Sequence, residues 1–115
     1  MVNRQKKITT VFAALADPTR RRIMERLSER GESRVTLLAK PFHISKPAIS
    51  RHLRVLEDAR LIKRRRQGRL HLIRARAAGL HEAQRWIAHY AAGWDSAFDA
   101  LDKLLKAEQG KGKKP

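Results

Sequence analysis

The feature that most constrains the fold is a change of hydrophobic period next to Leu61. Before it, the stretch ISKPAISRHLRVLEDAR repeats apolar residues at helical spacing, with polar or basic residues between them. This pattern predicts an amphipathic helix over residues 45–58, with Ser45 as its N-cap. The residues of its inward face are Ile49, Leu53 and Leu56.

After Leu61 the chain reads IKRRRQGRLHLIRA, in which β-favouring residues stand on both sides of Gln67 and Gly68. A glycine at that point supplies the positive φ that a tight hairpin turn requires. Residues 62–75 are therefore predicted to form a strongly basic β-hairpin directly after the helix.

A shorter helix is expected over Val35–Lys40. Pro41 limits it, because a proline disfavours helical geometry at the residue before it, and PFHI then forms a tight turn. A short helix, a turn, a second helix with a basic outer face and a hairpin follow in the order of a winged helix-turn-helix. The predicted fold class is mainly α with a small β-hairpin (α+β). The second helix of such a unit enters the major groove of DNA.

Further helices are predicted on both sides of this unit. Apolar residues at helical spacing predict a first helix between Ile8 and Leu15. Asp17 is a good N-cap and Pro18 a good first residue for the next helix, which Gly31 ends.

A long C-terminal helix is predicted from an apolar stripe in which residues recur every seven positions. One row consists of Leu80, Ile87, Trp94 and Leu101, and the second of Ala91, Phe98 and Leu105. The sequence leaves open whether residues 77–107 form one helix or two that are split near Gly93, since an interior glycine costs about 0.5–1 kcal/mol relative to alanine. A monomer core and a dimer seam are both possible covers for the stripe. The seam is favoured, because one short domain has little else to cover it.

The length of 115 residues corresponds to one domain. We expect this domain over residues 8–108, with the basic segments 1–7 and 109–115 as frayed tails. The absence of cysteine excludes disulfides and thiolate metal sites. No stretch is apolar enough to span a bilayer and no signal peptide is recognised, so a cytoplasmic protein without a membrane partner is expected.

Charge points to a polyanionic partner. The chain has 27 Lys and Arg against 11 Asp and Glu, a net charge of +16, which favours nucleic acid or an anionic membrane surface. Between Ser45 and Arg76 there are 11 basic residues and two acids, a net charge of +9. Both acids, Glu57 and Asp58, lie at the end of the helix away from Ser45. The local charge therefore favours double-stranded DNA.

Candidate contacts with DNA follow from the predicted elements. The Ser45 end of the helix joins open backbone N–H groups, a positive helix dipole and Lys46, which suit a phosphate oxygen. Ser50, Arg51 and His52 have side chains that can bond base edges, and Arg51 is the best candidate for a guanine. Hairpin arginines would add sequence-independent affinity. The candidate DNA-binding residues are Ser45, Lys46, Pro47, Ala48, Ser50, Arg51, His52, Arg54, Arg64, Arg65, Arg66 and Arg69.

The stretches FAALADPTRRRIMERL, ISKPAISRHLRVLEDARLI and RRRQGR together resemble the ArsR family of winged-helix repressors, over roughly residues 8–105. The resemblance implies a homodimer that binds a palindromic operator and usually represses transcription, often of its own operon. It implies that Ser45–Arg54 recognises DNA, that 62–75 is the wing, and that the first and last helices build the dimer. The implied dimer residues are Val11, Phe12, Leu15, Leu80, Ile87, Tyr90, Trp94, Phe98 and Leu101.

The chain departs from the metal-sensing members of that family. The founding sensors carry cysteine pairs in the short helix before the turn, where this chain has VTLLAKPF. Others use Asp and His on the C-terminal helix. Here His81 and His89 lie about 80° apart around the helix and roughly 12 Å along it, so they cannot share a metal within one helix. WIAHYAAGWDSAFDALDKLL and KPFHISKPAIS resemble a metal-independent branch, so no cofactor or metal site is expected, and an inducer stays unidentified.

The sequence also allows two other functions. One is a nonspecific architectural protein that coats nucleic acid through its +16 charge. The other is a metal-sensing repressor with histidine and carboxylate ligands across a dimer. An enzyme has no support, because the sequence lacks a cysteine nucleophile, a glycine-rich phosphate loop and an HExxH motif. Ser50 and His52 are two positions apart on a helix and do not face each other.

Overall fold

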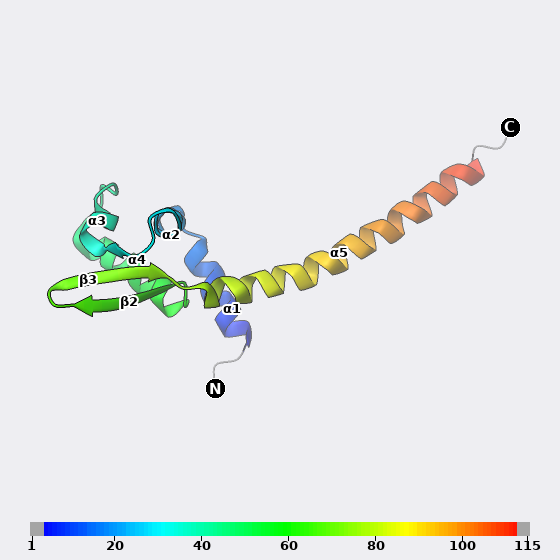
Figure 1. Cartoon of the computed structure of the whole chain (residues 1–115). Coiled ribbons are helices and arrows are strands. Elements are labelled where there is room, and N and C mark those ends of the chain that lie inside the picture. Colours follow the sequence, from blue (N-terminus) through cyan, green and yellow to red (C-terminus); the bar gives the residue numbers. More distant parts are fainter. Residues whose placement is uncertain (1–3, 113–115) are drawn as a thin grey trace. The chain divides into compact units, whose positions relative to one another are not determined.

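The computed structural model describes residues 4–112, which form five helices and a three-stranded antiparallel sheet (Figure 1). In chain order the elements are α1 (Arg4–Leu15), α2 (Pro18–Arg30), β1 (Ser33–Arg34), α3 (Val35–Ala39), α4 (Lys46–Asp58), β2 (Ile62–Gln67), β3 (Leu70–Ala75) and α5 (Ala77–Gly112). The chain divides into two compact units, the first ending at Ala83 and the second beginning at Gln84. The predicted helix-turn-helix and hairpin both lie in the first unit.

The predicted caps of α2 and α4 are confirmed. Asp17 caps α2, because its carboxylate accepts the backbone N–H of Arg20 at 3.0 Å. Gly31 ends α2 with a φ of 75°. The Ser45 hydroxyl oxygen caps α4 by accepting the backbone N–H of Ala48 at 3.3 Å. Each cap satisfies an N–H group that has no partner inside its own helix.

The outer helices are longer than the apolar pattern predicts. α1 begins at Arg4 rather than near Ile8, because the segment RQKK consists of good helix formers although it carries no apolar repeat. α5 continues to Gly112, and the split considered at Gly93 does not occur. Residues 4–7 and 109–112 are therefore helical and not frayed tails, and the remaining tail residues lie outside the described part of the chain.

The core of the first unit forms where α1, α2 and α4 meet the sheet. The three predicted inward residues of α4 are all buried. The apolar spacing of α2 predicts a buried face of Ile23, Met24 and Leu27, of which Ile23 and Leu27 are buried and Met24 packs against the core while partly exposed. Val11 is 1% exposed and belongs to this core. Its assignment to a dimer interface is therefore not retained, because it has almost no surface left to bury. Phe12 and Leu15 pack against the core and remain partly exposed.

The hairpin is confirmed, and a short strand missing from the prediction joins it. β2 and β3 pair antiparallel with Gln67 opposite Leu70, so the turn has two residues. Gly68 supplies the positive φ at the first turn position, with a value of 61°, as a type II′ turn requires. β1 pairs with the other edge of β3, in the order β1-β3-β2. A two-residue strand has too little sequence to show a period.

The link between α4 and β2 is tightly bonded. The Arg60 N–H donates to the Glu57 carbonyl and the Leu61 N–H to the Leu56 carbonyl, both at 3.0 Å, which is the Schellman arrangement. Arg60 takes the left-handed position with a φ of 59°, where glycine is usual. Its carbonyl also accepts the N–H of Gly79 at 2.9 Å.

The first turns of α5 pack closely on this link. A Cβ on Gly79 would lie 2.4 Å from the Ala59 carbonyl oxygen, so only glycine fits there without a shift of the backbone. The Arg60 guanidinium forms an ion pair with Glu82, one helical turn further along. The link at residues 59–61 thus holds together three elements of the first unit: α4, β2 and the start of α5.

The second unit is the helix from Gln84 onward, and its large apolar side chains are exposed. Trp94 is 63% exposed and Phe98 59%. Neighbouring rings contact each other along the helix: Trp86 and Tyr90 are tilted, with centroids 4.6 Å apart, and Trp94 and Phe98 are stacked, with centroids 5.6 Å apart. Within one described chain, this stripe is not buried.

Candidate nucleic-acid interface

The outer face of α4 presents the predicted polar and basic residues to solvent. Its opposite face is fixed by Ile49, Leu53 and Leu56, each 5% exposed or less. Because a helix turns by about 100° per residue, burial of that face directs a different set of side chains outward. The exposed members of the candidate site on α4 and its cap are Ser45, Lys46, Pro47, Ser50, Arg51 and Arg54, while Ala48 is half-buried.

The N-terminus of α4 offers fewer free donors than expected. Pro47 has no N–H, and the N–H groups of Ala48 and Ile49 are occupied by the side chain and carbonyl of Ser45. Among the first donors of α4, the backbone N–H groups of Ser45 and Lys46 have no bond to the described residues and are left for an anion. The Lys46 ammonium and the Ser45 hydroxyl hydrogen are further donors here, so side chains rather than a row of amides would hold a phosphate.

His52 points away from the outer face of α4. Its Nδ1 lies 3.3 Å from a guanidinium nitrogen of Arg20 and 3.9 Å from the Asp17 carboxylate. Its side chain is 21% exposed. Its position, three residues after Ile49 and four before Leu56, places it beside the buried face, a helical-wheel signal that the sequence prediction missed. His52 therefore ties α4 to the start of α2, and we do not retain it as a reader of bases.

Two consecutive arginines of α2 hold the end of α1, which the sequence reasoning also missed. Arg20 donates from Nε to the Ala14 carbonyl at 2.7 Å, and from a terminal nitrogen to Ala13 at 3.0 Å. Arg21 donates to the Leu15 carbonyl at 2.7 Å. These bonds satisfy carbonyls that have no partner inside α1. A basic run such as TRRR does not by itself indicate that its arginines bond backbone carbonyls, because the acceptors lie in another helix.

The arginines of the wing differ in whether they already have partners within the protein. Arg65 forms two bonds with the carboxylate of Glu32, at 2.8 and 2.6 Å. These bonds hold the pKa of Glu32 below its ordinary value and raise the pKa of Arg65. Arg66 donates to the Gly68 carbonyl at 3.1 Å and braces the turn. Arg64 is half-buried, 3.9 Å from the Glu57 carboxylate.

Arg69 occupies the second position of the hairpin turn, is exposed and forms no ion pair in the described part of the chain. It is therefore the wing arginine most available to a DNA phosphate. The predicted wing set is brought together on one hairpin, but three of its four arginines also serve the fold.

Among residues 4–112 no three His, Asp or Glu side chains stand together in a way that would hold a metal ion. None of the helices within that range combines the length and apolarity needed to cross a membrane.

Comparison with known proteins agrees with this geometry. The model of the family "Bacterial regulatory protein, arsR family" matches residues 17–64. The transcriptional repressor SdpR of Bacillus subtilis is 34% identical over 83 residues, covering 72% of this chain and 91% of that protein. The HTH-type transcriptional regulator Rv2034 of Mycobacterium tuberculosis is 36% identical over 97 residues, covering 84% and 87%.

Solved structures have the same fold. A crystal structure of an ArsR family transcriptional regulator has a TM-score of 0.76 at 35% identity, covering 84% of this chain and 98% of that one. An ArsR-like regulator from Rhodococcus sp. RHA1 has a TM-score of 0.75 at 31% identity, covering 90% and 96%. The winged helix-turn-helix, the family model and these relatives together assign the protein: the chain belongs to the arsR family of bacterial regulatory proteins and is a DNA-binding transcriptional regulator.

Proposed function

We propose that the protein is a homodimeric transcriptional repressor that reads a two-fold symmetric operator with α4 and grips the flanking backbone with its wing. It acts by binding and not by catalysis, and its place is with the chromosome in the cytoplasm. The observation that carries the proposal is the outer face of α4. Ser50, Arg51 and Arg54 are exposed there on a helix whose other face is buried.

Roles on α4 follow from side-chain chemistry. Arg51 lies near the middle of the exposed face and can donate two parallel bonds to the O6 and N7 atoms of a guanine. Ser50 can bond either an acceptor or a donor on a base edge. Lys46 and the Ser45 hydroxyl stand at the helix N-terminus and suit a phosphate oxygen.

The wing supplies affinity that does not depend on sequence. Arg69 at the turn is the first candidate for a phosphate, with Arg66 beside it. Arg65 would contact DNA only after exchanging Glu32 for a phosphate, so we assign it a smaller share than its charge suggests.

The stripe of the second unit supports a dimer. A contiguous row of exposed apolar side chains on one helix is unusual for a monomer and typical of an interface. We propose that two copies bury this stripe together with Phe12 and Leu15 of α1. In the second unit the proposed seam residues are Ile87, Tyr90, Trp94, Phe98 and Leu101, and in the first unit Leu80 is added to Phe12 and Leu15. Among the solved structures of this fold is one described as homodimeric, from Mycobacterium bovis, at 24% identity.

Selection of bound duplexes from a random pool tests the proposal. We expect a palindrome whose half-sites are separated by about one helical turn, roughly 34–36 Å, bound by two chains. A pool without enrichment would favour the architectural alternative, in which the +16 charge binds any duplex.

Arg51→Ala tests the reading role on the selected operator. We expect a loss of about 1–3 kcal/mol in binding free energy, confined to the specific site, because a bidentate contact with one base is removed. Arg69→Ala is the matched control and should weaken binding to the operator and to scrambled DNA alike, with a flatter salt dependence. An unchanged ratio of specific to nonspecific affinity in Arg51→Ala would contradict the assignment.

A further inference from the structure

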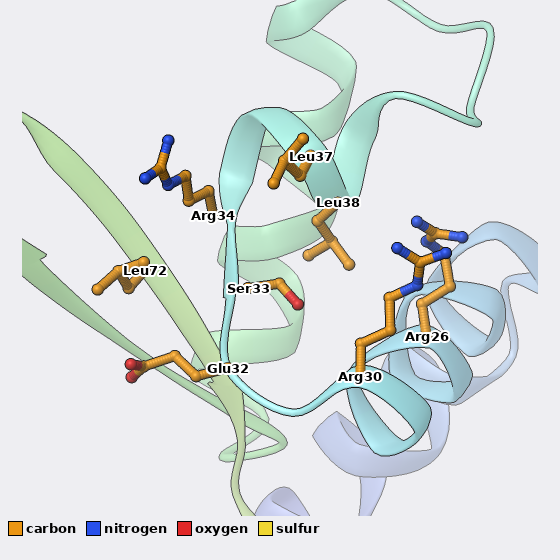
Figure 2. Close-up of a pocket in the computed structure, with 8 residues that line it drawn as sticks. All are labelled: Arg26, Arg30, Glu32, Ser33, Arg34, Leu37, Leu38 and Leu72. Carbon is orange, nitrogen blue, oxygen red and sulfur yellow. The ribbon is translucent and has the colours of Figure 1, made fainter.

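A pocket in the first unit lies between the C-terminal half of α2, the strand β1, α3 and β3 (Figure 2). Its volume is about 460 Å³, which falls within the range of sites for small organic molecules. Its lining combines two kinds of side chain, arginine and leucine. They are Arg26, Arg30, Arg34, Leu37, Leu38 and Leu72.

The charge of this pocket is unbalanced. Arg26 and Arg30 are four positions apart on α2, so they share one face, and like charges at that spacing repel. Among residues 4–112 neither of them forms an ion pair, and neither does Arg34. The acid in the lining is Glu32, and both of its oxygens are occupied by Arg65.

Arg26 lines the pocket, and its Nε atom is buried and has no hydrogen-bond partner. Because the buried Nε offers no surface to a ligand, an anion in the pocket would bond the terminal nitrogens of this guanidinium. Arg30 has a separate reason for its place, because a cation in the last turn of α2 is stabilised by the helix dipole. That explanation does not extend to Arg26, which lies one turn earlier.

The other half of the lining is apolar. Leu38 is buried, Leu72 is half-buried and Leu37 is 54% exposed. Figure 2 shows Arg26 and Arg30 on one side of Leu38, with Arg34 and Leu72 on the other. A bare anion would satisfy the guanidinium groups but leave the leucine surface in water. A molecule with both an anionic group and an apolar body satisfies both halves.

We propose that this pocket binds a small amphipathic organic anion, a carboxylate with a compact apolar body. The carboxylate accepts hydrogen bonds from Arg26 and Arg30, and the apolar body covers Leu37 and Leu72. A DNA phosphate offers the same anionic chemistry without the apolar body. The two are therefore separated by comparing organic carboxylates with an inorganic anion.

Titration calorimetry on the full chain tests the proposal with phenylacetate, isovalerate and hexanoate as probes. We expect at least one carboxylate to bind, with an affinity at least tenfold above that of its neutral amide and of sulfate. The proposal is overturned if none binds, if the amide binds equally well, or if sulfate binds as tightly as the carboxylates.

Variants locate the binding. The double variant Arg26→Gln, Arg30→Gln should weaken carboxylate binding at least tenfold. Arg76→Gln removes a charge from an exposed position outside the lining and should leave it unchanged. Leu37→Asp gives a second variant with little risk to folding, because that side chain is exposed, and it should also weaken binding at least tenfold. Equal affinity in the double variant and the Arg76→Gln control would overturn the site.

Discussion

Two amphipathic helices of this chain differ in whether their apolar faces are buried. α4 buries its apolar face against α1, α2 and the hairpin, and Leu53 and Leu56 are 1% and 0% exposed. The second unit carries a longer apolar face, yet Trp94 and Phe98 are about 60% exposed. Hydrophobic periodicity is the same kind of signal in both helices. It shows that a helix has a face to cover, but not whether the cover comes from its own chain.

This difference indicates that the first unit determines the stability of the fold and that the second unit determines self-association. The first unit contains its own core, so a substitution inside that core should lower the free energy of unfolding by the same amount at every protein concentration. The second unit has no cover of its own in the described residues, so its behaviour should depend on concentration if a second copy covers it. The following substitutions test this contrast, from the largest expected effect to the smallest.

Leu53→Ala should have the largest effect. Removing a fully buried side chain from the centre of the α4 face should lower the free energy of unfolding by about 2–5 kcal/mol. Urea denaturation followed by circular dichroism measures the loss, which should be the same at all protein concentrations. Leu53→Met keeps most of the volume and should cost less than about 1.5 kcal/mol. A loss below that value in Leu53→Ala would contradict the core assignment.

Trp94→Ala should act on assembly rather than on the first unit. A large aromatic side chain at the centre of an interface contributes about 2 kcal/mol or more, equivalent to roughly a thirtyfold weaker dimer. Sedimentation equilibrium measures the dissociation constant, and the chemical shifts of the first unit should be retained. Lys103→Ala, a polar position of the same helix, serves as the control. Unchanged self-association in Trp94→Ala would place the seam elsewhere.

The two helix caps give a smaller, pH-dependent contrast. The backbone N–H of Arg20 holds the pKa of Asp17 below its ordinary value, so the ionised cap is favoured in the folded chain. This stabilisation is present above the ordinary pKa of an aspartate and is lost as the pH falls through the lower folded value. Asp17→Ala should cost about 1 kcal/mol at neutral pH and little in strong acid.

Ser45→Ala is the matched control for Asp17→Ala, because a serine cap does not ionise. Its cost, also about 1 kcal/mol, should be nearly constant with pH. Urea denaturation at a series of pH values compares the two variants. A pH-independent cost in Asp17→Ala would contradict the linkage of that cap to acid stability.

The elements that could be predicted from the sequence are those with a local cause. α4 has a serine cap and three apolar residues at helical spacing, and the hairpin has a glycine at the turn. The order of these elements was sufficient to indicate a winged helix-turn-helix. The start of α1 was predicted too late, because Arg4–Lys7 favours a helix through propensity without an apolar repeat.

What could not be predicted depends on partners distant in the sequence. β1 exists because Ser33 and Arg34 pair with β3, and the bonds of Arg20 to the end of α1 depend on how two helices pack. For the same reason the sequence could not show which wing arginines are already paired, since Arg65 is bonded to Glu32, 33 residues away. His52 is the exception, because its place beside Ile49 and Leu56 was readable from the helical wheel.

The hydrogen-bonded link at residues 59–61 fixes the spacing between the two elements that are proposed to contact DNA, α4 and the wing. The link is held by two hydrogen bonds, by the left-handed conformation of Arg60 and by the close contact of Gly79. These contacts keep α4 and the wing at one separation. In the proposed complex, a fixed spacing between α4 and the wing would require the duplex to bend or to change its groove width in order to contact both elements. Base pairs that no side chain touches would then affect affinity through how readily they deform.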